Sequence, residues 1–180
     1  MTDSANDAGP SLSRRVFAAA PIAAGAAGLF GASQEASAAG AVKLSAGDRL
    51  EIMELLSRYA WAYDCNDPEA AAAAFTPDGS IEAFGQITKG REAIVKLIES
   101  VYEIRGDKIW THLIDHYVFQ PTKEGCRVFC YWTQVEKIAP NENGNIRATG
   151  YYVTDCVQHD GAWLIERRAI VPWDGSKLPW

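Results

Sequence analysis

Residues 45–67 read SAGDRLEIMELLSRYAWAYDCND and contain the longest helical pattern that we identify in the chain. Apolar side chains recur every three or four residues from Ile52 to Tyr63, which is the spacing of one face of an α-helix. Ser45 precedes this pattern and Asp48 follows three residues later, as in a capping box whose usual Glu is replaced by Asp. The spacing predicts a long amphipathic helix that ends near Cys65 and packs its apolar face against the rest of the chain.

Beyond this helix the chain continues as two more helices and then as strands. Asp67-Pro68 predicts the start of a short helix that reaches Phe75. A turn over Thr76–Gly79, a short strand over Ser80–Phe84 and a third helix over about 91–104 follow. The apolar period then changes to two, which predicts four strands over residues 111–120, 126–138, 146–159 and 162–171.

Three helices followed by a meander of antiparallel strands predict an α+β fold. We expect a strongly curved, mostly antiparallel sheet to wrap around the long helix and to enclose a blind cone suited to an apolar ligand. Six Trp, seven Tyr and six Phe residues are enough to fill a core and to line such a pocket.

The composition excludes several classes of function. The 180-residue chain carries a net charge of −6 and no cluster of Lys and Arg in its body, which argues against a nucleic-acid partner. It contains no Gly-rich nucleotide-binding motif and no nucleophile elbow, so a nucleotide or covalent-serine mechanism has no support. With three His and no metal-ligand spacing, we expect neither a metal nor another cofactor.

Residues 1–38 are similar to a twin-arginine signal peptide. Arg14-Arg15 lies in the sequence SRRVF, residues 16–33 are uncharged, and Ala36-Ser37-Ala38 offers a cleavage site. We therefore expect export to the periplasm or the medium, a mature domain over residues 39–180, and no stable membrane insertion once the signal is removed. The alternative is a disordered Ala-rich tail with a chance arginine pair.

An oxidising destination draws attention to the four cysteines at positions 65, 126, 130 and 156. Cys126 and Cys130 stand four residues apart on one predicted strand, roughly 13 Å from each other, so they cannot pair. Two interpretations remain open, namely a disulfide between Cys130 and Cys156 on neighbouring strands, or four free thiols.

The order and spacing of several motifs resemble those of SnoaL-like proteins in the nuclear-transport-factor-2-like (NTF2-like) superfamily. The motifs include Arg58-Tyr59-Ala60, Tyr63-Asp64, Phe75–Gly79, Gly90–Ile94, Thr111-His112-Leu113 and Asp160–Trp163. Within that superfamily the chain looks most like scytalone dehydratase and the bile acid 7α-dehydratase group. The resemblance implies a cone-shaped fold, a hydrophobic small-molecule substrate, cofactor-independent lyase chemistry and a homodimer or homotrimer.

The same resemblance points to the residues of a site. It implies that His112 and Asp64 form a proton-accepting pair and that Tyr63 assists at a carbonyl or a leaving group. The residues expected to contact an aromatic, polyketide or steroid-like substrate are Tyr59, Phe84, His116, Trp132 and Tyr152. In a regular strand, His116 would share the face of His112.

Several functions remain compatible with these residues. We expect a carbon–oxygen lyase (dehydratase) or a retro-aldol lyase, in which His112 removes a proton and Tyr63 or Tyr59 stabilises the oxyanion. An isomerase or cyclase would use the same groups. A non-catalytic, exported ligand-binding protein would keep the cone but would not need His112 and Asp64 to meet.

Overall fold

The computed structural model describes residues 40–175 and 177–180, so the predicted signal over 1–38 lies outside the described part. The helices are α1 (Ala46–Asp64), α2 (Pro68–Ala73) and α3 (Arg91–Arg105). The strands are β1 (Phe75–Ala83), β2 (Gln86–Lys89), β3 (Ile109–Pro121), β4 (Gly125–Lys137), β5 (Asn145–His159) and β6 (Ala162–Pro172). They form one sheet in the order β2-β1-β6-β5-β4-β3, in which only the pair β1–β6 is parallel.

The long first helix forms as its sequence predicts. Ser45 accepts a hydrogen bond from the backbone N–H of Asp48, and the Asp48 carboxylate accepts from the backbone N–H of Ser45. The indole N–H of Trp163 on β6 donates to the same carboxylate at 3.1 Å, which fixes the start of α1 against the sheet. At the other end, Asn66 takes a left-handed conformation (φ 64°) that stops the helix.

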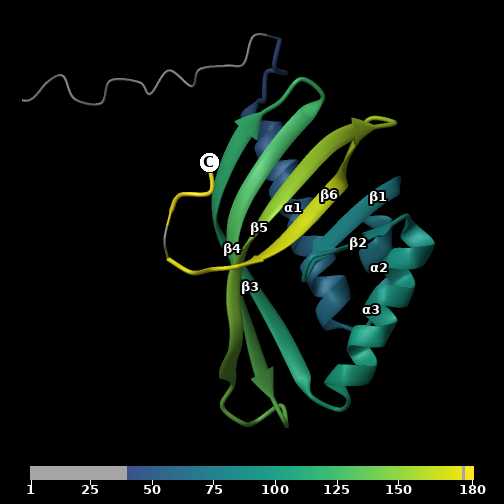
Figure 1. Ribbon diagram of the computed structural model, residues 1–180, viewed down its shortest axis with the longest axis vertical. Coiled ribbons are helices and arrows are strands. Elements are labelled where there is room, and N and C mark those ends of the chain that lie inside the picture. The colour runs from purple at the N-terminus through teal and green to yellow at the C-terminus, as the bar shows by residue number, and fades with distance from the viewer. Residues whose placement is uncertain (1–39, 176) are drawn as a thin grey trace, which may run out of the picture. The chain divides into compact units, whose positions relative to one another are not determined.

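All three helices lie against the concave side of the curved sheet (Figure 1). The apolar face of α1 packs Ile52 and Leu56 against Phe75 of β1 and Ile165 of β6, all fully buried. The predicted α+β class, with helices that precede a curved and mostly antiparallel sheet, is confirmed. None of the helices in the described part is long and apolar enough to cross a membrane.

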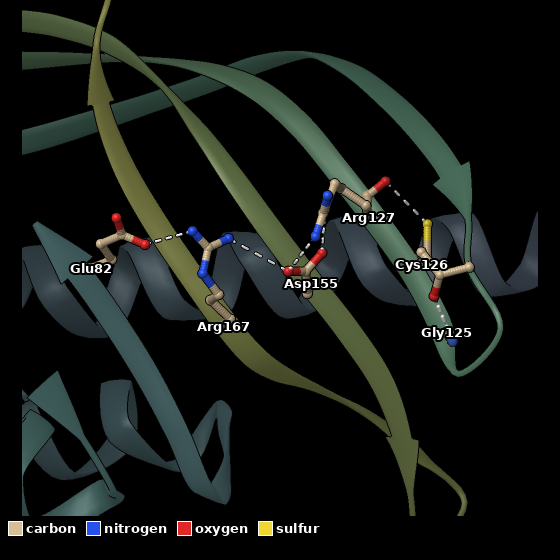
Figure 2. A network of polar contacts seen from close by, with 7 residues as sticks. Glu82, Gly125, Cys126, Arg127, Asp155 and Arg167 are labelled. Atoms are coloured by element: carbon tan, nitrogen blue, oxygen red, sulfur yellow. Dashed lines mark hydrogen bonds and ion pairs between the residues drawn. The ribbon is translucent and has the colours of Figure 1, made fainter. Parts of the chain in front are cut away.

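The outer face of the sheet carries a chain of ion pairs. Figure 2 shows Arg127 of β4, Asp155 of β5, Arg167 of β6 and Glu82 of β1 in a row across neighbouring strands, on the face turned away from α1. Asp155 accepts from Arg127 at 2.6 Å and lies 3.6 Å from Arg167, which in turn pairs with Glu82. Alternation along a strand places Asp155 and its buried neighbour Thr154 on opposite faces.

The last residues cross this outer face. Trp173 packs against Tyr131 and Tyr151, with ring centroids 5.5 Å and 5.8 Å away, and Trp180 lies 5.4 Å from Phe129. In Figure 1 the yellow C-terminal segment runs on the side opposite the helices. The described part of the tail therefore covers the aromatic side chains of β4 and β5.

Two local expectations are wrong. The segment Thr76–Gly79 is part of β1 rather than a turn, because a register shift between Phe75 and Ser80 absorbs it. Gly79 permits this irregularity, since an added Cβ would lie 2.9 Å from the backbone oxygen of Ile165. The predicted strand over Ser80–Phe84 corresponds to the second half of β1, which ends one residue earlier at Ala83, and the sequence analysis did not predict β2, which pairs with it.

The cysteine pairing considered above does not match the register. Cys130 lies opposite Tyr152, and Cys156 lies opposite Cys126, so a bond between Cys130 and Cys156 would require the strands to shift. Cys65, Cys130 and Cys156 are free thiols in the structure, and the last two are buried. Burial raises the pKa of Cys130 to about 11, which keeps this thiol protonated and unreactive.

The capping box yields a test of stability. We expect Ser45→Ala to lower the free energy of unfolding by about 1 kcal/mol, because it leaves the backbone N–H of Asp48 without its acceptor. Urea denaturation measures the change. Ser57→Ala, which removes a hydroxyl bonded to a helical carbonyl in the middle of α1, is the matched control and should change stability by less. Equal effects of the two substitutions would show that the cap contributes nothing of its own.

Candidate active site

A histidine and a carboxylate meet where α1 ends beside β3. His112 Nδ1 lies 2.6 Å from Asp64 Oδ1, and the backbone N–H of His112 donates to Asp64 Oδ2 at 2.7 Å. The two side chains are 10% and 14% exposed. Because an ionised carboxylate can only accept, Nδ1 carries the proton and Nε2 is the basic nitrogen of the ring. The predicted contact between His112 and Asp64 is therefore present in the structure.

Helix α3 holds the end of α1 in place. The Tyr102 hydroxyl donates to the carbonyl of Tyr63 at 2.6 Å, and Arg105 Nη1 donates to the carbonyl of Asp64 at 3.0 Å. The last carbonyls of a helix have no partner within the helix. Arg105 supplies a donor to that of Asp64, and Tyr102 adds a second donor to that of Tyr63, which also accepts from the backbone N–H of Asn66 at 3.3 Å. The carboxylate of Asp64 is positioned by its own helix end and by the side chains of a second helix.

His112 opens into a cavity of about 850 Å³ between the helices and the concave sheet face. Aromatic and aliphatic side chains make up most of its wall, including Tyr59, Tyr63, Trp110, Trp132, Tyr152 and Ile170. A cavity of this size can enclose a molecule of several fused rings. Five of the predicted site residues, namely Tyr59, Tyr63, Phe84, Trp132 and Tyr152, line it together with His112.

Two phenol groups stand next to the histidine. The ring of Tyr63 meets the ring of His112 edge-on with centroids 5.2 Å apart, and Tyr59 lies 6.2 Å from Tyr63. Burial raises the pKa of both tyrosines, so both remain protonated donors. Neither hydroxyl bonds to another described residue, which leaves them able to donate to a ligand.

Two stacked aromatic rings form part of the cavity wall beside His112. Trp132 lies 6.3 Å from His112 and stacks on Tyr152 with centroids 5.7 Å apart and planes 23° from parallel. Gly150 makes this position possible, because a Cβ there would lie 2.7 Å from Trp132 Nε1. This indole N–H is buried and has no hydrogen-bond partner in the described part of the chain.

Arg168 is a functional candidate that the sequence reading missed. It is fully buried behind the cavity floor, with its guanidinium carbon 3.6 Å from the ring centroid of Tyr152 and 4.6 Å from that of Tyr59. Nη1 reaches Thr154 at 3.4 Å, whereas Nε and Nη2 have no partner among the described residues. The signal was present in the pair Arg167-Arg168, since neighbouring strand residues face opposite sides and one arginine had to point inward.

Phe84 marks the mouth of the cavity. It is 94% exposed and, with Gly85, forms the two-residue loop between β1 and β2. Both residues have positive φ, 52° and 77°, as a type I′ turn requires. The positive φ of Phe84 costs roughly 1–2 kcal/mol of conformational energy. Strained residues of this kind cluster at functional sites.

His116 does not lie where it was expected. A register shift between Asp115 and Val118 forms a bulge in β3, and His116 takes a positive φ of 56° within it. Its ring is 73% exposed and contacts Tyr131, which places it outside the cavity. The expectation that it shares the face of His112 is wrong because the bulge breaks the two-residue alternation of the strand.

A model of the SnoaL-like domain matches residues 45–169, which is more than half of the chain and includes both members of the His112–Asp64 pair. The chain belongs to the SnoaL-like family. No protein of curated function matches this SnoaL-like chain in sequence.

Three solved structures illustrate the fold of this SnoaL-like domain. A protein of unknown function with a cystatin-like fold from Nostoc punctiforme is 26% identical over 77% of this chain and 98% of its own, with a TM-score of 0.65. An NTF2-like protein from Novosphingobium aromaticivorans is 23% identical, covers 72% and 84%, and has a TM-score of 0.61. A candidate scytalone dehydratase from the same organism is 21% identical, covers 71% and 85%, and has a TM-score of 0.60. The NTF2-like fold is thereby confirmed.

The described residues contain no cluster of three or more His, Cys, Asp or Glu side chains that could hold a metal ion. The expectation of a cofactor-free SnoaL-like site stays a prediction. The groups that this chain brings to the cavity are a histidine with one basic nitrogen, two phenols and a cation behind the floor. Such a set can accept a proton from carbon and stabilise a negative oxygen.

The buried arginine can be tested by removing its charge. Desolvation of the Arg168 charge costs several kcal/mol, and each of its buried cation–π contacts with a tyrosine ring stabilises the fold by about 2 kcal/mol. We therefore expect Arg168→Met, which keeps the bulk of the side chain, to leave Tm unchanged or higher. Thermal unfolding checks this, with the core truncation Ile165→Ala as a control that must lower Tm. A loss of Tm as large as that of the control would assign Arg168 to stability rather than to the site.

The tyrosines predict how stability depends on pH. Burial holds the pKa of Tyr63 and Tyr152 well above the unfolded value of about 10. Above that pH the unfolded chain loses protons that the folded chain keeps, so the stability present below pH 10 declines as pH rises. Urea denaturation at pH 8, 10 and 11 measures the decline, which should be smaller in Tyr63→Phe. An equal decline in the variant and the wild type would contradict the assignment.

Proposed function

We propose that this SnoaL-like protein is a cofactor-independent lyase, of the dehydratase or retro-aldol type, that acts on a hydrophobic aromatic, polyketide or steroid-like molecule. One observation carries the proposal. A histidine oriented by a carboxylate at 2.6 Å opens into an apolar cavity beside two phenols that remain protonated. A ligand-binding protein would not need the carboxylate to accept from both the ring and the backbone of the histidine.

The chemistry begins with a proton on a carbon next to a carbonyl group. His112 Nε2 takes this proton, and Asp64 stabilises the imidazolium that forms. The electron pair moves onto the carbonyl oxygen as an enolate, to which Tyr63 or Tyr59 donates a hydrogen bond. The enolate then expels the β-hydroxyl group, which takes the proton back from the imidazolium and leaves as water. In a retro-aldol substrate, the base removes the hydroxyl proton instead, and an aldehyde leaves as the carbon–carbon bond breaks. The electron pair of that bond forms the enolate, which takes the proton back from the imidazolium and becomes the ketone.

Arg168 supports the same step from behind the floor. Its positive charge lies against the faces of Tyr59 and Tyr152, so it makes this end of the cavity favourable for a negative oxygen. It has no carboxylate partner among the described residues, so this charge is not cancelled locally. Arg168 is thus a positioning residue that acts through the tyrosines, and it need not touch the substrate.

Export and self-association remain part of the proposal. The twin-arginine motif at Arg14-Arg15 supports transport of the folded domain to the periplasm or the medium. We also propose a homodimer or homotrimer, in keeping with the resemblance noted in the sequence. Neither point bears on the chemistry in the cavity.

The proton-transfer step can be tested without knowledge of the natural substrate. Aryl ketones that lack a β-hydroxyl group are incubated with the protein in D₂O, and mass spectrometry follows deuterium uptake at the carbon next to the carbonyl. We expect His112→Ala to reduce the rate at least 100-fold, since general base catalysis contributes about 10²–10⁴-fold. Asp64→Asn should lower it as well, because an amide no longer fixes the basic tautomer.

His116→Ala is the matched control, a histidine on the same strand whose ring lies outside the cavity. It should exchange at the wild-type rate. Ketones with a β-hydroxyl group then separate elimination from simple isomerisation, because only a lyase releases a conjugated enone. Exchange that survives in His112→Ala would disprove the mechanism, and binding without exchange by the wild type would favour a ligand-binding protein.

A further inference from the structure

Charge is distributed unevenly around the cavity. The protein as a whole is acidic, with a net charge of −6, yet no Asp or Glu is among the described residues that line the cavity wall. Arg147 at the start of β5 is the one lining side chain with a permanent charge within the described part. A cavity built for a neutral hydrocarbon has no use for such a residue, because desolvating an arginine opposes binding.

The structure holds Arg147 in place at the mouth. Its Nη1 donates to Glu136 Oε2 at 2.9 Å, and its guanidinium lies over the ring of Trp110 at 4.8 Å. Trp110 Nε1 and Lys108 Nζ approach the same carboxylate oxygen at 2.8 Å and 3.6 Å. The hydrogen bond from Trp110, together with that from Arg147 and the charges of Arg147 and Lys108, lowers the pKa of Glu136 and keeps this carboxylate ionised.

This cluster has a surplus of positive charge. Two cations, Arg147 and Lys108, share one carboxylate, so about one positive charge is left unbalanced at the mouth. Of the described residues only Glu136 bonds to Arg147, and it does so through Nη1, which leaves Nε and Nη2 as donors for a ligand. An arginine fixed by a carboxylate and an indole ring can offer a planar pair of N–H groups to an anion.

The position of Arg147 sets the shape of its ligand. Arg147 lies against Trp110, and Trp110 precedes His112 by two residues on β3, roughly 7 Å along the strand. An acidic group at Arg147 therefore lies well away from the carbon that faces His112. Most of the wall is apolar, although the amide of Gln134 on β4 lies opposite His112, and Arg168 makes the inner end favourable for a second negative oxygen.

We propose that the cavity binds an amphipathic organic anion, a molecule with a hydrophobic body and an acidic group that Arg147 holds at the mouth. This inference deepens the proposed function by naming the class of substrate. It rests on the proposed function only in that the same cavity serves both. The acidic group is separated from the reacting carbon by several bonds, so the substrate is not a simple β-hydroxy acid.

Two fluorescent probes with the same skeleton test the inference. One is the anion 1-anilinonaphthalene-8-sulfonate, and the other is the neutral N-phenyl-1-naphthylamine. We expect the wild type to prefer the anion and Arg147→Gln to weaken anion binding about tenfold, the effect of one charge-assisted hydrogen bond. The neutral probe should bind the variant as it binds the wild type, and Arg147→Lys should retain part of the preference.

Two further variants complete the design. Arg58→Gln removes an arginine from the solvent-exposed face of α1 and should change neither affinity. Ala83→Phe fills part of the cavity and should weaken both probes, which locates them there. The inference is overturned if Arg147→Gln weakens both probes equally or neither, if Arg58→Gln has the same effect as Arg147→Gln, or if Ala83→Phe leaves both affinities unchanged.

The anion-binding experiment can fail or succeed independently of the lyase proposal. His112→Ala should keep the preference for the anionic over the neutral probe, because the ring lines the cavity but is not part of the anion site. Selective anion binding in a protein that exchanges no deuterium would support the site and disprove the lyase. Deuterium exchange without a preference for the anionic probe would support proton transfer in the cavity and disprove the anion site.

Discussion

The contact between Asp64 and His112 is the constraint on which the rest of the site depends. It joins the end of the first helix to the third strand across 48 residues of sequence, and it uses both oxygens of one carboxylate. Asp64 can reach β3 only because α1 ends where it does, and Asn66 together with the donors Tyr102 and Arg105 fixes that end. The capping box at the start of α1 and the bonds from α3 at its end therefore serve one purpose, which is to set the length and the position of this helix.

Sequence was sufficient for the parts of the molecule that follow a regular period. The long helix, the third helix and the four long strands agree to within a few residues, because apolar periods of 3.6 and 2 run through most of their length. The contact between His112 and Asp64 came from the family resemblance and not from periodicity. What failed were the irregularities, the bulge at His116 and the shifted register before Ser80, since a bulge inserts residues without a clear mark in composition. Arg168 escaped notice because an arginine on a strand is ordinarily read as solvent-exposed.

Several features of the cavity lower the stability of the folded protein. A buried guanidinium with unpaired nitrogens, an indole N–H without a partner and a phenylalanine at positive φ each cost free energy. All three lie on or just behind the cavity wall, whereas the core between α1 and the sheet is conventionally packed. Such a division is what a protein shows when the polarity and shape of a binding site, rather than stability, select its residues.

The described tail, with Trp173 and Trp180 on the aromatic side chains of β4 and β5, has a consequence for self-association. A segment that is covalently linked to the surface it covers by only a few residues has an effective concentration of the order of millimolar. A second copy that approached the same face at ordinary cellular concentrations could not compete with it. Sheet-to-sheet association through this face would therefore have to incorporate the tail as part of the contact.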